Sequence, residues 1–201
     1  GLYSAANNTS REKLDANMDY LERALRFSVD EAALKNSIVR LHLMLDKEPQ
    51  EYSLELGPDD HFVLPASKTD QIGSLSLEEQ EKKKKELDAI NRKFSRIKDF
   101  QEKNKLMEDG IKIVGIGSAQ SEKMITDGDV ALYVYPTGEK DNGIIILGND
   151  EELAGVQINS FTHEYKRVYR KIDFTWSTNE EFEERRSALA KELYLDWQKT
   201  E

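Results

Sequence analysis

Three histidines are the side chains in this sequence best suited to acid–base or metal chemistry near neutral pH. His42 lies in an alternating apolar stretch, His61 lies beside two aspartates in a turn, and His163 lies in a later alternating stretch. No two histidines have the spacing of metal ligands on one helix, and no HExxH motif occurs. The chain has no cysteine, which excludes thiolate metal sites, disulfides and cysteine nucleophiles.

Other short motifs favour a structural interpretation. Residues 115–117 (Gly-Ile-Gly) follow a short apolar stretch but lack the third glycine and the helix of a dinucleotide-binding loop. Residues 127–129 (Asp-Gly-Asp) lack the remaining oxygen ligands of a calcium loop and are typical of a hairpin turn. Ser118 and Ser121 have no histidine–aspartate partner nearby in the sequence. We therefore expect no catalytic, cofactor-binding or metal-binding residue.

Basic segments raise the possibility of an anionic partner. Residues 165–176 interleave basic and aromatic side chains, but strand alternation divides them between two faces. The net charge of −10 also makes the overall field unfavourable for nucleic acid, and we expect no nucleic-acid partner. Lys82–Lys85 could form an anion or lipid patch. Because glutamates surround this run, we interpret it as a solvated helix face.

The first element that the apolar periodicity predicts is an amphipathic helix over residues 9–36. Thr9 or Ser10 can cap its start, and Glu12 has the capping-box spacing from Thr9. The apolar stripe of this helix, which we expect to pack on the protein's own core or to face a partner, consists of Leu14, Met18, Leu21, Leu25 and Val29.

The period then changes from helical to alternating, which predicts a β-hairpin region over residues 37–65. Strands are expected at 38–45, 52–56 and 61–64, although a helical interpretation of residues 34–45 is also possible. Residues 66–75 read as a linker.

A highly charged helix is predicted over residues 76–109, with Ser76 as its N-cap and Gly110 ending it. We expect this helix to pack through a narrow apolar seam formed by Leu87, Ile90, Phe94 and Ile97.

The remainder of the chain predicts an antiparallel sheet over residues 111–176 and a helix over 178–199, capped by Thr178. Residues 143–147 are entirely apolar, which favours a central strand, and residues 163–176 continue as extended sheet. The fold class is therefore α+β, a single domain over residues 1–201 in which a long N-terminal helix packs on antiparallel sheet. The inner stripe expected for the last helix consists of Phe182, Arg186, Leu189, Leu193 and Trp197.

The order of these elements resembles the type IV pilin-like family, most closely the minor pseudopilin H subunits of type II secretion. The first helix ends in residues 30–36, which contain Asp-Glu-Ala, and the strands at 39–43 and 52–56 follow at once. The inserted helix 76–109 and the helix 178–199 depart from the family's pattern. Further segments that carry the resemblance are residues 110–113, 128–138, 143–147 and 156–161.

The resemblance implies a structural subunit without catalytic residues. An apolar membrane segment preceding residue 1 would anchor the chain in the inner membrane, and the domain would lie in the periplasm. The implied partners are other pilin or pseudopilin subunits, packed in a filament that helps folded proteins through an outer-membrane channel. In this arrangement, residues 9–36 would join the membrane segment to the sheet.

Two other classes of protein are compatible with the same pattern. A cell-envelope interaction or ligand-binding sensor module would carry a concave, largely apolar pocket on its sheet. A soluble enzyme would need a constellation of nucleophile, base or metal that the sequence does not offer.

Overall fold

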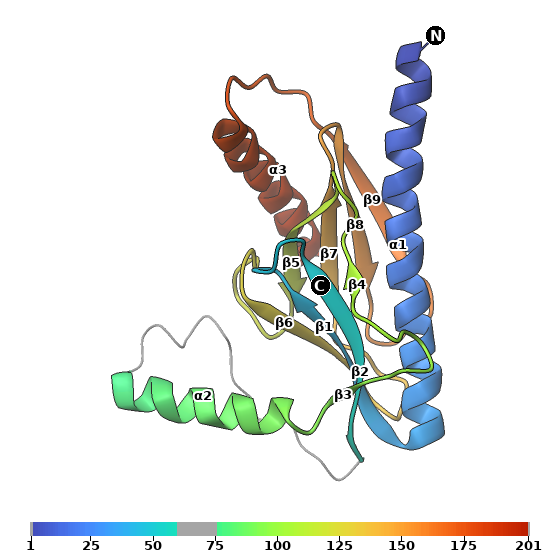
Figure 1. The fold of residues 1–201 in the computed structure, drawn as a ribbon, viewed down its shortest axis with the longest axis vertical. Coiled ribbons are helices and arrows are strands. Elements are labelled where there is room, and N and C mark those ends of the chain that lie inside the picture. The colour runs from blue at the N-terminus through green and yellow to red at the C-terminus, as the bar shows by residue number, and fades with distance from the viewer. Residues whose placement is uncertain (1, 60–75, 201) are drawn as a thin grey trace.

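The computed structural model describes residues 2–59 and 76–200, with side chains from residue 9 onward. Helices and antiparallel strands occur in separate groups, which confirms the α+β class (Figure 1). In chain order, the elements are α1 (Leu2–Lys35), β1 (Ser37–Met44), β2 (Glu51–Asp59), α2 (Leu77–Asn91), β3 (Ser95–Arg96), β4 (Lys105–Leu106), β5 (Lys112–Ser118), β6 (Asp129–Val134), β7 (Gly143–Gly148), β8 (Glu152–Ile158), β9 (Lys166–Lys171) and α3 (Asn179–Lys199).

The strands form two antiparallel sheets, and the antiparallel region predicted over residues 111–176 contributes to both. The first sheet has the order β3-β2-β1-β6, with β4 also paired to β2, and the second has the order β5-β7-β8-β9. Strand β6 leaves its neighbours in sequence and pairs with β1, where Val39 lies opposite Val134 and Leu41 opposite Leu132. In this register the apolar residues of both strands face the same core, which favours the pairing of β6 with β1.

Helix α1 packs on both sheets through its apolar stripe. Leu14, Met18 and Leu21 are fully buried, Leu25 is 1% exposed, and Val29 packs at the margin of the same core. These positions therefore contact the protein's own sheets. Thr9 and Ser10 lie inside α1, which begins at Leu2, so neither is the N-terminal cap that the sequence predicts.

The predicted hairpin of β1 and β2 is confirmed, with β1 at the centre of its sheet. Asn36 ends α1 with a φ of 48°, a left-handed conformation typical of a helix C-terminus. The β1–β2 pairing then runs from Ser37 opposite Asp59 to Met44 opposite Glu51. The strand expected at 61–64 and the linker expected at 66–75 lie outside the described residues.

Helix α2 is much shorter than the helix predicted over residues 76–109. The Ser76 cap is confirmed, since its hydroxyl accepts a hydrogen bond from the Glu79 amide, but the helix ends at Asn91. Phe94 and Ile97 are buried in the body instead of continuing a helical seam. The helix ends because the residues after it pair with β2. Strand β3 is antiparallel to β2, and the Ile97 amide donates a hydrogen bond to the Leu54 carbonyl. Gly110 consequently ends no helix and lies in a turn with a φ of 85°.

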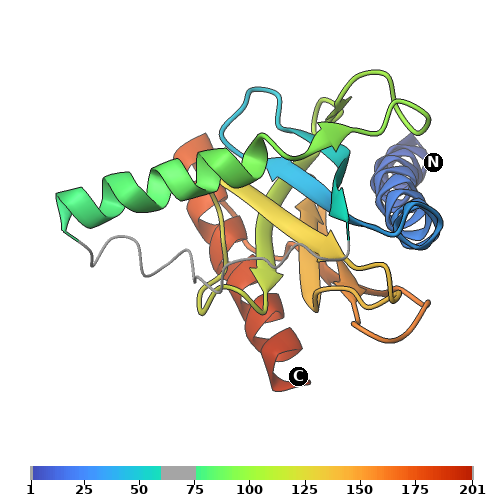
Figure 2. The ribbon, with the colours of Figure 1, turned by 90° about the horizontal axis from the view of Figure 1, so that it is seen from below.

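Helix α3 begins as predicted and covers the second sheet on the face opposite α1 (Figure 2). The Thr178 hydroxyl accepts a hydrogen bond from the Glu181 amide. Trp197 and Leu193 pack on the outward residues of β7, while the inward residues of β7 join the core under α1. Strand β7 is therefore buried on both faces, as its apolar sequence predicts.

The extended segment expected over residues 163–176 is only partly sheet, because β9 covers Lys166–Lys171 alone. Beyond it, Phe174 and Trp176 contact Phe182 of α3. None of the helices in the described ranges combines the length and hydropathy that a membrane span requires.

Candidate functional site

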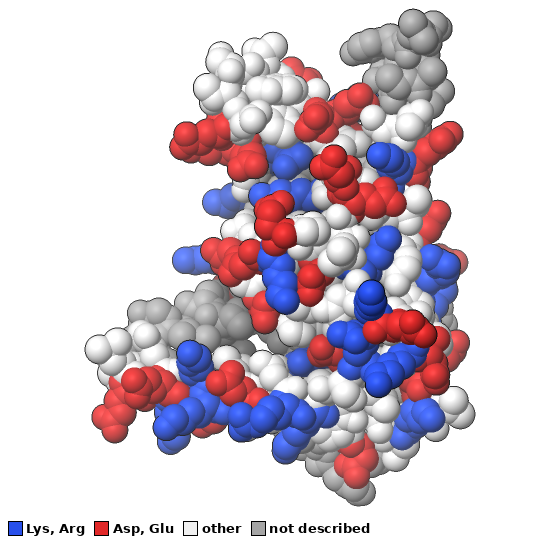
Figure 3. Space-filling model, viewed as in Figure 1, with Lys and Arg blue, Asp and Glu red and all other residues white. Residues whose placement is uncertain are grey.

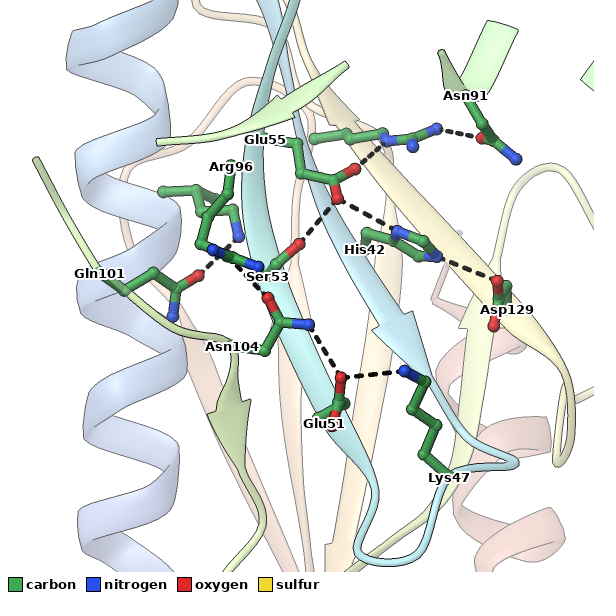
Figure 4. Close-up of polar contacts among 12 residues, drawn as sticks. His42, Lys47, Glu51, Ser53, Glu55, Asn91, Arg96, Gln101, Asn104 and Asp129 are labelled. Carbon is green, nitrogen blue, oxygen red and sulfur yellow. Dashed lines mark hydrogen bonds and ion pairs between the residues drawn. The ribbon is translucent and has the colours of Figure 1, made fainter. Parts of the chain in front are cut away.

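The outward face of the first sheet carries a hydrogen-bonded polar cluster, which we define as Arg40, His42, Ser53, Glu55 and Asp129 (Figure 4). The cluster forms because alternation turns Arg40 and His42 of β1 away from the α1 side, next to Ser53 and Glu55 of β2. It lies mostly below the surface, since the side chains of Arg40 and Glu55 are 4% and 15% exposed.

Glu55 is the acceptor at the centre of the cluster. The Nε of Arg40 donates to its Oε1 at 2.7 Å, and the Ser53 hydroxyl donates to its Oε2 at 2.8 Å. The Nδ1 of His42 lies 3.3 Å from the same Oε2, and the Nε2 of His42 lies 3.2 Å from Asp129 Oδ2. The imidazole therefore bridges a carboxylate of β2 and one of β6.

These contacts favour the charged forms of both His42 and Glu55. Burial opposes protonation of His42, but the hydrogen bond and negative charge of Glu55 outweigh it and raise the pKa of His42. Burial alone would raise the pKa of Glu55, yet the hydrogen bond from His42 and the charge of Arg40 lower that pKa to about 2.

A pH dependence of stability follows from the raised pKa of His42. Its contribution is complete below about pH 6.5, the unfolded-state pKa, and is lost as the pH rises through the higher pKa of the folded protein. We expect the wild type to lose more stability across this interval than a His42→Gln variant, measured by urea unfolding at several pH values. His163→Gln, in an exposed loop, is the control and should keep the wild-type pH dependence. Equal pH dependence in wild type and His42→Gln would contradict this assignment.

The geometry of the cluster is that of a structural network. Ser53 donates its proton to Glu55, and no contact joins its hydroxyl to His42, so the pair does not form an activated nucleophile. Over residues 2–59 and 76–200, no group of three or more His, Asp or Glu side chains is arranged to hold a metal ion.

The other sequence candidates occupy ordinary structural positions. Residues 115–117 lie within β5, and residues 127–129 form a turn in which the Gly128 amide donates to Asp46. Ser118 accepts from the Gln120 amide, and Ser121 donates to the Lys123 carbonyl. His163 is exposed, and His61 lies outside the described residues.

The two arginines of the basic and aromatic stretch at 165–176 pair with acidic residues of two helices. Arg167 contacts both Asp19 and Glu22 of α1, and the Tyr169 hydroxyl donates to Asp15 at 2.8 Å. Arg170 contacts Asp196 of α3. We call the α1 side of these contacts the α1–β9 seam, since it joins the exposed flank of the helix to the last strand.

A second feature is an acidic groove of about 660 Å³ between the β1–β2 turn, the segment 107–112 and the start of α3. Arg186 lies at its base, 6% exposed, and donates to the Asn149 carbonyl at 3.0 Å. The carboxylates that line the groove, all of them exposed, are Asp46, Glu48, Glu108, Asp109, Asp150 and Glu183.

Sequence reasoning missed both features. The alternation of β1 places Arg40 and His42 on its polar face, but it carries no signal that this face is covered. The groove combines three segments that are far apart in the chain, and only the density of acidic residues in each of them could have indicated it.

Comparison with known proteins gives no relative from which a function could be inferred, so the function proposed below rests on the geometry of the structure. No protein family matches the chain. Neither the curated proteins nor the solved structures contain a match either.

Proposed function

We propose that this protein is a structural subunit of a pilin-like filament, of the kind that the minor pseudopilins of type II secretion form, and that it acts by packing against other subunits. The observation that carries this proposal is the position of α1, which lies along both antiparallel sheets and is bound to them by one continuous apolar stripe. An N-terminal helix held in this way can join a filament core to a globular body.

The polar contacts of α1 support the same role. Its apolar stripe contacts the core on one side, and the α1–β9 seam fixes its flank through Arg167 and Tyr169. Arg11 also lies over the Tyr169 ring, with its guanidinium carbon 3.7 Å from the ring centroid. A helix held on two sides would transfer load from its N-terminal end to the whole body.

The face of α1 that remains exposed is the natural contact for neighbouring subunits. It includes Glu12, Ala16, Arg23 and Arg26. Under this proposal the domain lies in the periplasm, and an apolar segment that precedes residue 1 anchors it in the inner membrane and later enters the filament.

The proposal is tested by photo-cross-linking in cells that carry the native gene. A photoreactive residue at Ala16 or Arg23 should give cross-links to other pilin-like subunits in the membrane fraction, because both positions face away from the body. The same residue at Lys191, exposed on α3, is the control for a surface remote from this helix.

The native reading frame provides an independent test of the filament role. The proposal requires about 20 predominantly apolar residues shortly before Gly1, enough to span a bilayer. A reading frame that lacks them would refute the filament role, whatever the cross-linking result.

The sensor-module alternative has less support. It predicts an apolar pocket on a sheet, whereas the groove described above is bordered by turns and by exposed carboxylates. The second sheet is covered by α1 on one face and by α3 on the other.

A further inference from the structure

Helix α2 is unusual because it has no packed face. It contains no buried residue, and Figures 1 and 2 show it extending away from both sheets. Among the described residues, the contacts of α2 with the body lie at its C-terminal end, where Asn91 accepts a hydrogen bond from Arg40 at 2.8 Å and Ile90 packs beside Phe94. Leu77 and Leu87 are exposed on this helix. A helix with no buried face is stabilised by pairs of its own side chains or by contact with another body.

The segment that begins in α2 is also the most basic part of the chain. Residues 82–93, which precede the buried Phe94, contain six Lys or Arg and two Asp or Glu, in a protein whose net charge is −10. We call residues 82–93 the basic arm. Figure 3 shows Lys and Arg side chains along α2 with a few acidic ones among them, and side chains of both charges over the upper half of the same face.

The acidic groove has the complementary charge. Six exposed carboxylates line it, against the cations of Lys47, Lys112 and Arg186. Of the ion pairs within the described ranges, none neutralises Glu108 or Asp109, which project from the segment between β4 and β5. Opposite potentials of this kind steer two protein surfaces together and fix their register.

The two surfaces lie at opposite ends of α1. A shallow pocket that shares Asp109 and Asp150 with the groove also includes Ser10 and Lys13 of α1. The basic arm instead joins the body beside Arg40, just after α1 has ended at Lys35. Helix α2 extends away from both sheets (Figures 1 and 2), so the lysines of one copy do not lie in the groove of that same copy.

We infer that the basic arm of one copy docks in the acidic groove of the next copy along the α1 axis. Such a contact is heterologous, joining two different surfaces, and therefore propagates as an open chain of subunits. The inference rests on the proposed filament function, which gives the direction of stacking along α1, and it adds the residues through which successive copies would contact one another.

Charge reversal on either surface tests the contact. Lys84→Glu with Lys85→Glu reverses part of the basic arm, and Glu108→Lys with Asp109→Lys reverses part of the groove. Each double variant alone should self-associate about tenfold more weakly than the wild type in sedimentation equilibrium, because like charges then meet. A mixture of the two double variants should recover association, since each arm then faces a groove of opposite charge.

The matched control reverses two exposed lysines that line neither surface, Lys123→Glu with Lys191→Glu. It should associate as the wild type does, and circular dichroism should show all variants folded. A wild type that stays monomeric at high concentration and low salt would overturn the inference. Failure of the mixture to recover association would do the same.

The absence of cysteine allows a second, independent measurement. Separate Lys84→Cys and Glu108→Cys proteins should form a mixed disulfide on oxidation, while Lys191→Cys with Glu108→Cys should not. If the native reading frame carries the membrane segment but these cross-links fail, the filament role stands and the docking of identical copies is refuted.

Discussion

Replacing Glu55 by glutamine should lower the free energy of unfolding by about 3 kcal/mol, as removal of one partner from a buried ion pair does. Glutamine keeps the size and an acceptor oxygen but leaves Arg40, whose side chain is 4% exposed, without a counter-charge. It also removes the carboxylate whose hydrogen bond and charge raise the pKa of His42. Urea unfolding at neutral pH measures the effect, and the titration of His42 by NMR should shift to lower pH in the same variant.

Glu51→Gln is the matched control for Glu55→Gln, because it lies on the same face of β2. Its carboxylate pairs with Lys47 at 3.3 Å, but that lysine side chain is 58% exposed. We therefore expect a loss below about 1 kcal/mol. Similar losses in the two variants would show that the polar cluster contributes no more than a surface pair.

Truncation of Trp197 to alanine should cost about 3 kcal/mol or more, because it leaves a cavity between α3 and the second sheet. Trp197 is 5% exposed and packs with Leu193, Tyr194 and the outward residues of β7. The close fit is visible at Gly117, where even a Cβ would approach the Trp197 ring to 2.8 Å. Guanidinium unfolding gives the loss, and hydrogen exchange should show faster opening of α3.

Leu195→Ala separates this packing effect from helix propensity. Leu195 lies on the same helix and is 43% exposed, so its truncation should change stability by less than about 1 kcal/mol. An equal loss in Leu195→Ala and Trp197→Ala would mean that α3 contributes through its helicity and not through its contact with the sheet.

Elements whose signals are local were predictable from the sequence. The alternation of β1, the Thr178 cap of α3 and the apolar run of β7 each depend on neighbouring residues, and each occurs as expected. The apolar stripe from Leu14 to Leu25 also predicted which face of α1 is buried.

Elements decided by distant contacts were not predictable. Phe94 has helical spacing from Ile90, but in the fold it covers Gly57 of β2, where even an added Cβ would collide with its ring. The end of α2 is therefore set by a strand about 40 residues earlier in the chain. The assignment of β6 to the first sheet likewise depends on β1, which no local pattern around residues 129–134 indicates.

The polar cluster illustrates the same limit. Arg40 and His42 occupy polar positions of an alternating strand, and such positions usually face solvent. Their burial requires Asn91 and Phe94 to reach over the sheet and β6 to pair alongside. The sequence thus predicts that these two residues share one face of the strand, whereas their burial and their contact with Glu55 depend on the tertiary structure.

Strand β6 belongs to the first sheet, whereas its neighbours in sequence, β5 and β7, belong to the second. This arrangement affects the order in which the chain can fold during synthesis. The first sheet lacks one edge strand until residues 129–134 emerge, and β5, which precedes them in the chain, pairs with β7, which follows them. The apolar stripe of α1 must also wait for β7 and β8, which complete the same core. Neither half can therefore fold ahead of the other, so this domain should become compact only after β8 has emerged and should resist division into autonomous fragments.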